Sequence, residues 1–191
     1  GEYFSNGPLA PVFDSKEGAK AMVEGLGGIY QSYENISLNP LDVLLRSKTN
    51  EHQISMIIRA MLGDSYTEDM DEHIDHTINT AFELPQEHRT FNAIYEYAFP
   101  KDTLIRKAFG KWITDRKGKQ GLYSHVFNSP IDQMSGLLEQ SFLVGINMNE
   151  ALEDPYLGAP VVAHISTAIS QAARRNHNGF TIFVDEIFIR D

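Results

Sequence analysis

Two adjacent carboxylates, Asp185 and Glu186, directly follow a run of β-branched and aromatic residues at positions 180–184. Such a run predicts a strand that is buried on both faces, and an interior strand should carry no charge. In parallel α/β sheets, ligands bind at the carboxyl ends of the strands. An Asp-Glu pair there is typical of a nucleoside triphosphatase, in which the Asp orders Mg²⁺ and the Glu polarises the attacking water. The plain alternative is a strand that runs into an acidic turn.

The residues before this pair predict an α/β crossover. Positions 141–148 read as a strand, and positions 159–175 carry the apolar face of a strong helix, with Pro160 in its first turn. The chain then passes through an Asn- and Gly-containing segment into the acidic strand at 180–188. This strand, helix, strand order predicts a parallel, right-handed connection.

The first forty residues predict the beginning of the same layer. Positions 9–13 read as a short strand, a helix follows over 16–26, and positions 29–33 alternate like a half-exposed strand. Asp14 or Ser15 is expected to cap the helix, and Gly27 with Gly28 to end it. Asp14 could also stand at the ligand edge of the sheet, but helix capping is the simpler explanation.

The middle of the chain is helical by its periodicity. Four apolar stripes lie between positions 50 and 115, joined by short connections, and they predict a small all-α bundle. The stripes are Ile54, Ile57, Ile58 and Met61; Ile74, Ile78 and Phe82; Phe91, Ile94, Tyr95 and Phe99; and Leu104, Ile105, Ala108, Phe109 and Trp112. Positions 122–127 are interpreted as an edge strand or ribbon. We therefore expect an α/β core over 1–46, an inserted helical subdomain over 47–121 and a return to the core over 122–191.

Composition narrows the function classes. The chain has 191 residues, a formal net charge of -10 and no cysteine. A surface this acidic is not a nucleic-acid footprint as a whole, and the lack of thiols excludes disulfides and Cys-based zinc sites. No apolar run approaches the roughly 20 residues that cross a bilayer, and no signal peptide is recognisable. The sequence is that of a soluble protein.

The order of several short motifs resembles a known family over essentially the whole chain. These motifs are Val-Phe-Asp at 12–14, Gly-Gly-Ile-Tyr at 27–30, Asn-Pro-Leu at 39–41, Gly-Ile-Asn-Met-Asn at 145–149, Asp-Pro at 154–155 and Thr-Ile-Phe-Val-Asp-Glu at 181–186. Their order and spacing are similar to the large ATPases of type IV secretion and conjugation, the CagE/TrbE-type components, between the phosphate-binding helix and the Walker B motif.

The resemblance implies a fold, a chemistry and a setting. The fold would be a partial RecA-like core of the HerA/FtsK kind with an all-α insertion. The parent protein would bind ATP and Mg²⁺, with Asp185 at the metal and Glu186 as the catalytic residue. It would work as an oligomer with other secretion subunits in the bacterial cytoplasm, at the cytoplasmic face of the inner membrane, in pilus assembly and export of protein or DNA.

The chain departs from the family at the phosphate site. A P-loop needs G-x-x-x-x-G-K-S/T, whose backbone N–H groups and Lys hold the phosphates, and this motif is absent from the sequence. We interpret the chain as a central piece of a longer ATPase, beginning beyond Walker A and ending just beyond Walker B. Alone, it is expected to be inactive and not to bind ATP tightly.

Other charged residues have two interpretations each. Arg174 and Arg175 suit a helix C-terminus, with a trans-acting arginine as the alternative. His73 and His76, near His52 in sequence, could share a metal, but an acidic first helical turn explains the surrounding charges more simply. Seven basic residues within 101–119 could meet DNA, lipid headgroups or an acidic partner, or form a solvated helix face. They are Lys101, Arg106, Lys107, Lys111, Arg116, Lys117 and Lys119.

Two rival functions come from other classes. In the first, the chain is a non-catalytic interaction module whose helical insertion docks secretion subunits, and the acidic strand is only structural. In the second, it belongs to a HerA-like DNA translocase. The residues flanking this chain would separate the three hypotheses.

Overall fold

The computed structural model describes residues 10–14, 19–141, 143–175 and 183–184. The chain divides into two compact units. The first combines Gly1–Ile36 with Gln133–Asp191, and the second is the continuous segment Ser37–Asp132. The first unit contains a sheet and the second is built from helices, so each is described by itself.

The first unit contains a four-stranded parallel sheet. Its strands are β1 (Ala10–Asp14), β2 (Ile29–Ser32), β3 (Leu143–Asn147) and β4 (Phe183–Val184), in the order β2-β3-β1-β4. Both β3 and β4 pair with β1 in parallel register. This sheet is compatible with the predicted α/β class, and the strands predicted near 9–13, 29–33 and 141–148 are confirmed. Strand β1 separates β3 from β4, which the sequence did not indicate.

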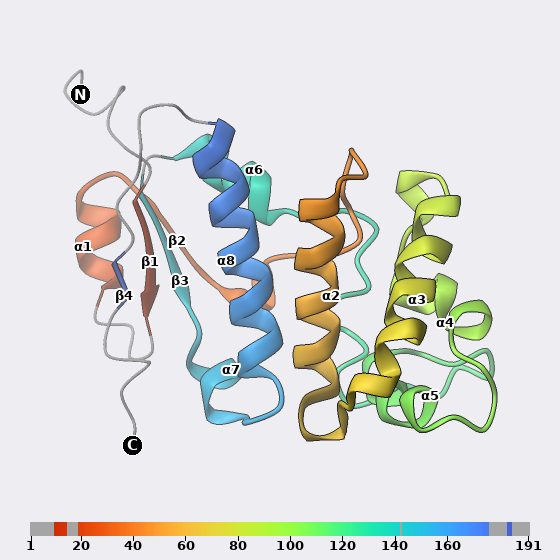
Figure 1. The fold of residues 1–191 in the computed structure, drawn as a ribbon. Coiled ribbons are helices and arrows are strands. Elements are labelled where there is room, and N and C mark those ends of the chain that lie inside the picture. Colours follow the sequence, from red (N-terminus) through yellow and green to blue (C-terminus); the bar gives the residue numbers. More distant parts are fainter. Residues whose placement is uncertain (1–9, 15–18, 142, 176–182, 185–191) are drawn as a thin grey trace. The chain divides into compact units, whose positions relative to one another are not determined.

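Helices lie on both sides of this sheet, with α1 (Lys20–Gly25) on one side and α8 (Gly158–Arg175) on the other (Figure 1). Helix α8 is the helix predicted over 159–175. Two short helices were not predicted, α6 (Met134–Gln140) and α7 (Asn149–Glu153). Both contact α8, and α6 also contacts β3.

Small residues let α1 approach the sheet. Val23 and Leu143 form a buried cluster, with Tyr30 packed against it. A Cβ on Gly145 would lie 2.5 Å from the Tyr30 ring, and a Cβ on Gly28 would lie 2.6 Å from the Leu143 carbonyl oxygen. Gly27 ends the helix with φ +80°, a conformation that favours glycine.

The second unit packs four α-helices with short 3-10 turns. The α-helices are α2 (Lys48–Leu62), α3 (Asp71–Glu83), α4 (Phe91–Ala98) and α5 (Leu104–Phe109). The turns are η3 (Gly63–Ser65), η4 (Glu68–Met70), η5 (Gln86–His88) and η6 (Gly110–Trp112), and η2 (Tyr33–Asn35) belongs to the first unit. The helices match the four predicted stripes. The insertion predicted over 47–121 lies within this unit.

Hydroxyl side chains begin three of these helices. Ser47, Thr90 and Thr103 each accept a hydrogen bond from the backbone N–H three residues later. Such N-caps satisfy donors that the first helical turn leaves unpaired. The starts of these three helices are therefore specified by nearby residues in the sequence.

The prediction of an edge strand over 122–127 is wrong. These residues form turns, and Tyr123 and Phe127 are buried against Trp112, with ring centroids 4.8 and 5.7 Å from it. The Trp112 indole Nε1 donates to the Met61 carbonyl oxygen at 2.8 Å, in the last turn of α2. The apolar residues at these positions therefore belong to a folded-back segment that fills the helical core, because tertiary packing overrides a short local pattern.

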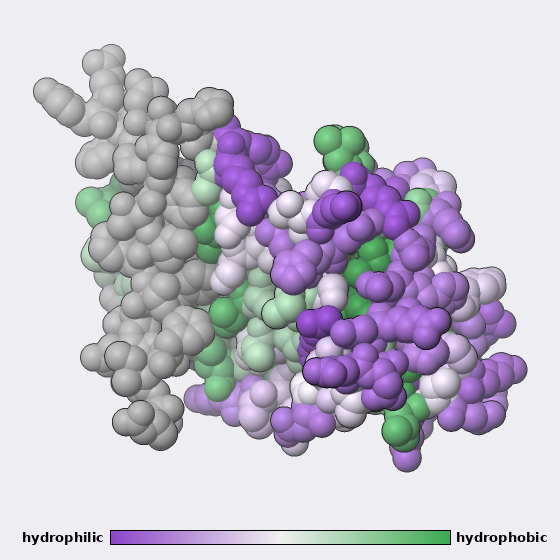
Figure 2. Space-filling view, viewed as in Figure 1, coloured by the Kyte–Doolittle hydropathy of each residue, from purple (hydrophilic) through white to green (hydrophobic). Residues whose placement is uncertain are grey.

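The visible surface of the helical unit is mostly hydrophilic, with small hydrophobic spots among the charged and polar side chains (Figure 2). Among the residues that the structure describes, no helix is both long enough and apolar enough to cross a membrane.

Candidate functional site

The carboxyl ends of the parallel strands meet at one edge of the sheet. Asn147, the last residue of β3, is in register with Asp14 at the end of β1 and with Ser32 at the end of β2. In β4, Val184 is in register with Phe13. This edge is where a parallel α/β sheet binds its ligand, so it is the candidate site.

The two carboxylates singled out from the sequence follow β4. Asp185 and Glu186 come directly after Val184 in the sequence and lie outside the described residues. Their assignments to Mg²⁺ and to water activation therefore stay predictions. The structure does describe the parallel pairing of Phe183 and Val184 with β1, which leads the chain toward this edge.

Asp14 is not the cap of α1. It is the last residue of β1, while the N-cap position of α1 belongs to Ala19, which makes no side-chain capping bond. The capping prediction was wrong because the strand continues one residue further and the helix begins later than its apolar pattern suggested. Asp14 therefore stands at the carboxyl edge of the sheet, where the sequence analysis had alternatively placed it.

The loop after β3 is shaped by asparagine side chains. Asn147 is only 8% exposed, and its Oδ1 accepts a hydrogen bond from the Asn149 backbone N–H at 2.9 Å. This short side-chain turn directs the chain from the strand into α7. Sequence reasoning did not assign Asn147 a role, although Asn-x-Asn directly after an apolar strand is a signal for such a turn.

Two glutamates from different segments meet at the same edge. The Ser32 hydroxyl donates to Glu34, and Glu34 shares a hydrogen bond with Glu150 at the start of α7. The negative charge of Glu34 is the main reason that the pKa of the exposed Glu150 is raised, with smaller contributions from that hydrogen bond, from desolvation and from the Glu153 carboxylate. This pair was missed from the sequence, where each glutamate is merely an acidic residue shortly after a strand.

Tyr33 directly precedes Glu34 and is buried. Burial, with smaller contributions from the carboxylates of Glu34, Glu150 and Asp154, raises the pKa of Tyr33 to about 12. The phenol therefore stays protonated at neutral pH.

These described groups do not form a triphosphate site by themselves. Ser32, Glu34, Asn147 and Glu150 offer hydroxyl, amide and carboxylate groups, and none of them carries the positive charge that phosphates require. Within the described ranges, no three His, Asp or Glu side chains are grouped to hold a metal ion, and this also disfavours a site on His52, His73 and His76. Phosphate and metal contacts would need other residues.

Two of the basic residues singled out from the sequence, Arg175 and Arg106, form ion pairs with glutamates. Arg175 Nη1 lies 3.7 Å from Glu139 Oε1, an exposed pair that fits the structural interpretation of the α8 terminus. Arg106 is largely buried and pairs with Glu96 at 2.7 Å, so it does not belong to a free basic surface.

No protein-family model matches the chain, and no curated protein matches it. Among solved structures, the chain is similar to VirB4 of Thermoanaerobacter pseudethanolicus, with a TM-score of 0.58 and 14% sequence identity. The match covers 93% of this chain and 62% of that chain. A likeness at this identity shows the fold alone.

Proposed function

We propose that this chain is part of a type IV secretion ATPase that couples ATP hydrolysis to pilus assembly and to the export of protein or DNA. In this proposal the sheet unit is a partial RecA-like core, and the helical unit is a subdomain inserted into it. The proposal uses the family resemblance of the sequence together with the topology and the structural likeness.

The observation that carries the proposal is the parallel pairing of β4 with β1. Val184 is opposite Phe13, one residue before Asp14, and Asp185 and Glu186 are the next residues of the chain. This pairing supports a Walker B strand whose acidic residues enter the ligand edge, and it argues against an isolated acidic hairpin. A parallel strand in that position is expected of an ATPase core.

The likeness to VirB4 supports the same assignment. The VirB4 structure matches 93% of this chain, so the fold agrees with the resemblance of the sequence to type IV secretion ATPases. The matched region spans 62% of that protein, so the activity of a whole ATPase would also need segments beyond the matched region. The phosphate-binding loop would be one of them, because G-x-x-x-x-G-K-S/T does not occur in this sequence.

The proposed roles divide the two carboxylates. Asp185 would order Mg²⁺ and its waters, and Glu186 would polarise the water that attacks the γ-phosphate. Asp14 and Asn147, at the adjacent strand ends, would border the same site. The chain alone, without a phosphate loop, is expected to be inactive.

The test uses the full-length protein that contains this chain. Glu186→Gln should lower ATP turnover about 10²–10⁴-fold while ATP still binds, because it removes only the general base. Asp185→Asn should weaken Mg²⁺-dependent nucleotide binding. Glu87→Gln is the matched control, since Glu87 is exposed in the helical unit. Undiminished turnover in the Glu186→Gln protein would show that the assignment is wrong.

A second candidate function is supported by the helical unit. Ser37–Asp132 is continuous in sequence and has its own buried core around Trp112. Such a unit could serve as a docking module for other secretion subunits or neighbouring protomers, or belong to a HerA-like DNA translocase. Whether the parent protein is a secretion ATPase or a DNA translocase, we expect an oligomer at the cytoplasmic face of the bacterial inner membrane. Binding of subunits by a protein with intact Glu186 but no ATP turnover would favour the module.

A further inference from the structure

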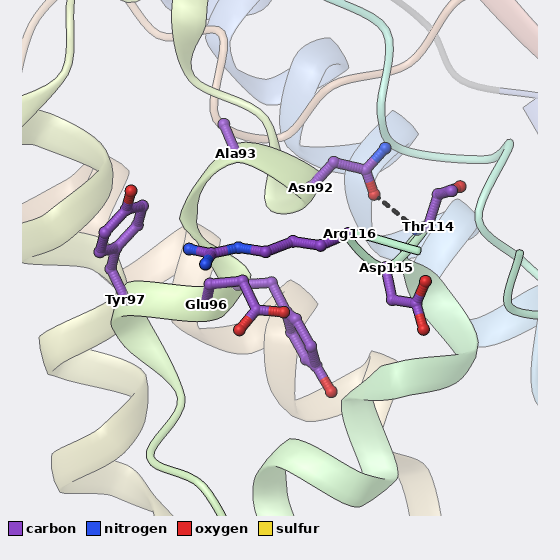
Figure 3. A pocket seen from close by; sticks show the side chains of 8 residues that line it. Asn92, Ala93, Glu96, Tyr97, Thr114, Asp115 and Arg116 are labelled. Atoms are coloured by element: carbon purple, nitrogen blue, oxygen red, sulfur yellow. Dashed lines mark hydrogen bonds between the residues drawn. The ribbon is translucent and has the colours of Figure 1, made fainter. Parts of the chain in front are cut away.

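A pocket of about 250 Å³ lies on the helical unit, away from the sheet edge in sequence. Its walls are the outer face of α4 and the segment 114–116 that runs beside it (Figure 3). We propose that this pocket binds an acidic peptide segment of a partner protein through Arg116. This inference is independent of the ATPase assignment, because it concerns only the helical unit.

The pocket is held open by hydrogen bonds in its walls. The Asn92 side chain accepts from the Thr114 backbone N–H at 2.8 Å, joining α4 to the neighbouring segment. The Asn92 backbone N–H in turn donates to Asn128 at 2.8 Å. Inner residues of α4, such as Phe91 and Ile94, are completely buried. The binding surface is therefore preformed, which lowers the ordering cost of binding.

The two carboxylates of the pocket are already engaged within the unit. Glu96 accepts a hydrogen bond from Arg106 Nη2 at 2.7 Å, and this bond is the main reason that the pKa of Glu96 is lowered. Arg106 is itself held by the Phe99 carbonyl oxygen at 2.7 Å and lies 4.6 Å above the Tyr95 ring. Asp115 accepts from the backbone N–H groups of Lys117 and Lys119, both at 2.9 Å.

Arg116 also lowers the pKa of Glu96 through its charge, but it does not form an ion pair with that carboxylate. In the part of the chain that the structure describes, Arg116 forms no ion pair, and its guanidinium lies 5.7 Å above the ring of Tyr97. Figure 3 shows the arginine extended across the pocket toward Tyr97, which is 72% exposed. A planar guanidinium that lies over an exposed aromatic ring can bind a carboxylate by donating two parallel N–H hydrogen bonds to it.

The surroundings add positive charge. Residues 101–119 contain seven basic and two acidic side chains, in a chain whose net charge is -10. Lys101, Lys117 and Lys119 are exposed. An anionic occupant is therefore favoured here and disfavoured over the rest of the protein.

The small volume and the overall charge distinguish between anionic partners. A pocket of about 250 Å³ holds one or two side chains and is no groove for a nucleic-acid backbone. A long polyanion would also meet the acidic remainder of the chain. A peptide with a few carboxylates near an apolar side chain that can pack on Tyr97 fits best.

The test measures binding of a fluorescein-labelled peptide with three Glu residues around a central Leu to the full chain, by fluorescence anisotropy in low salt. The same peptide with Gln in place of Glu is the ligand control. We expect the Glu peptide to bind at least about tenfold more tightly than the Gln peptide. Arg116→Glu should weaken its binding at least about tenfold, and Arg116→Lys by less, because lysine keeps the charge without the planar fork.

Lys48→Glu is the matched control variant, since Lys48 is exposed in the same unit on α2 and the charge change is identical. Circular dichroism spectra of all variants should coincide, because Arg116 makes no ion pair that its replacement would break. The proposal is overturned if both peptides bind equally or if Arg116→Glu behaves like Lys48→Glu. It is also overturned if single-stranded DNA or phosphatidylglycerol vesicles bind through Arg116 more tightly than the peptide does.

Discussion

Replacing Phe127 with Ala tests whether the segment after the helical bundle is part of its core. Phe127 is completely buried and stacks on Trp112, with ring centroids 5.7 Å apart. Truncating a buried Phe to Ala typically costs about 3–5 kcal/mol, from lost transfer energy and from the cavity that remains. Domains of this size are stable by about 5–15 kcal/mol, so this loss should move the unfolding transition far toward low denaturant.

The sequence provides its own probe for this experiment. Trp112 is the only tryptophan in the chain and is completely buried in the helical unit, so its fluorescence reports the unfolding of that unit. Urea titrations followed by Trp112 fluorescence should give a lower midpoint for Phe127→Ala with a similar slope.

Leu122→Ala is the control in the same segment, because Leu122 is 72% exposed. Its effect should stay within about 0.5 kcal/mol, as for most surface substitutions. A cost below about 1 kcal/mol for Phe127→Ala, where a fully buried aromatic residue should cost several times more, would refute the described packing. An equal cost for the two variants would refute it as well.

Two further predictions concern the sheet and the pocket wall. Gly145→Ala should destabilise the protein by about 1–3 kcal/mol in thermal unfolding, because the new Cβ would lie 2.5 Å from the Tyr30 ring. Gly136→Ala, where the Cβ would meet open space inside α6, should stabilise by up to about 1 kcal/mol, and a loss comparable to that of Gly145→Ala would contradict the steric argument. The Arg106 hydrogen bond lowers the pKa of Glu96 in the folded protein. The ionised Glu96 carboxylate therefore stabilises the fold above the ordinary glutamate pKa of about 4.3. This stabilisation is lost as the pH falls through the lower pKa that Glu96 has in the folded protein. Glu96→Gln should therefore be less stable than the wild type at pH 7, and the difference should shrink in urea titrations as the pH falls below the ordinary glutamate pKa; a constant difference would contradict the assignment.

Several elements were predictable because their signals are local. The stripes of Ile54, Ile57, Ile58 and Met61 and of their counterparts predicted the helices of the second unit, and Ser47, Thr90 and Thr103 supply their N-caps. Strand β3 and helix α8 were recognisable from an unbroken apolar run and a long amphipathic pattern. Such patterns depend only on the period of the element.

The wrong predictions concern segments whose structure depends on contacts with residues far away in the sequence. Positions 122–127 are rich in aromatic and β-branched residues, yet they form turns in which Tyr123 and Phe127 pack against Trp112. Helices α6 and α7 have only seven and five residues, too few for a helical period to be visible. Asp14 was interpreted as a cap because its place in β1 depends on pairing with Asn147, a residue 133 positions away in sequence.

The amino-acid order alone therefore indicated strands β1, β2 and β3, helix α8 and the helices of the second unit, and it pointed to Asp185 and Glu186 as residues able to do chemistry. Only the tertiary structure decided that β1 lies between β3 and β4, that Ser32, Asp14 and Asn147 end at one edge, and that Arg116 lies over Tyr97. The physical reason is range: helical and strand periods are set by neighbouring residues, whereas strand order and the pairing of charges depend on side chains that only the folded chain brings together.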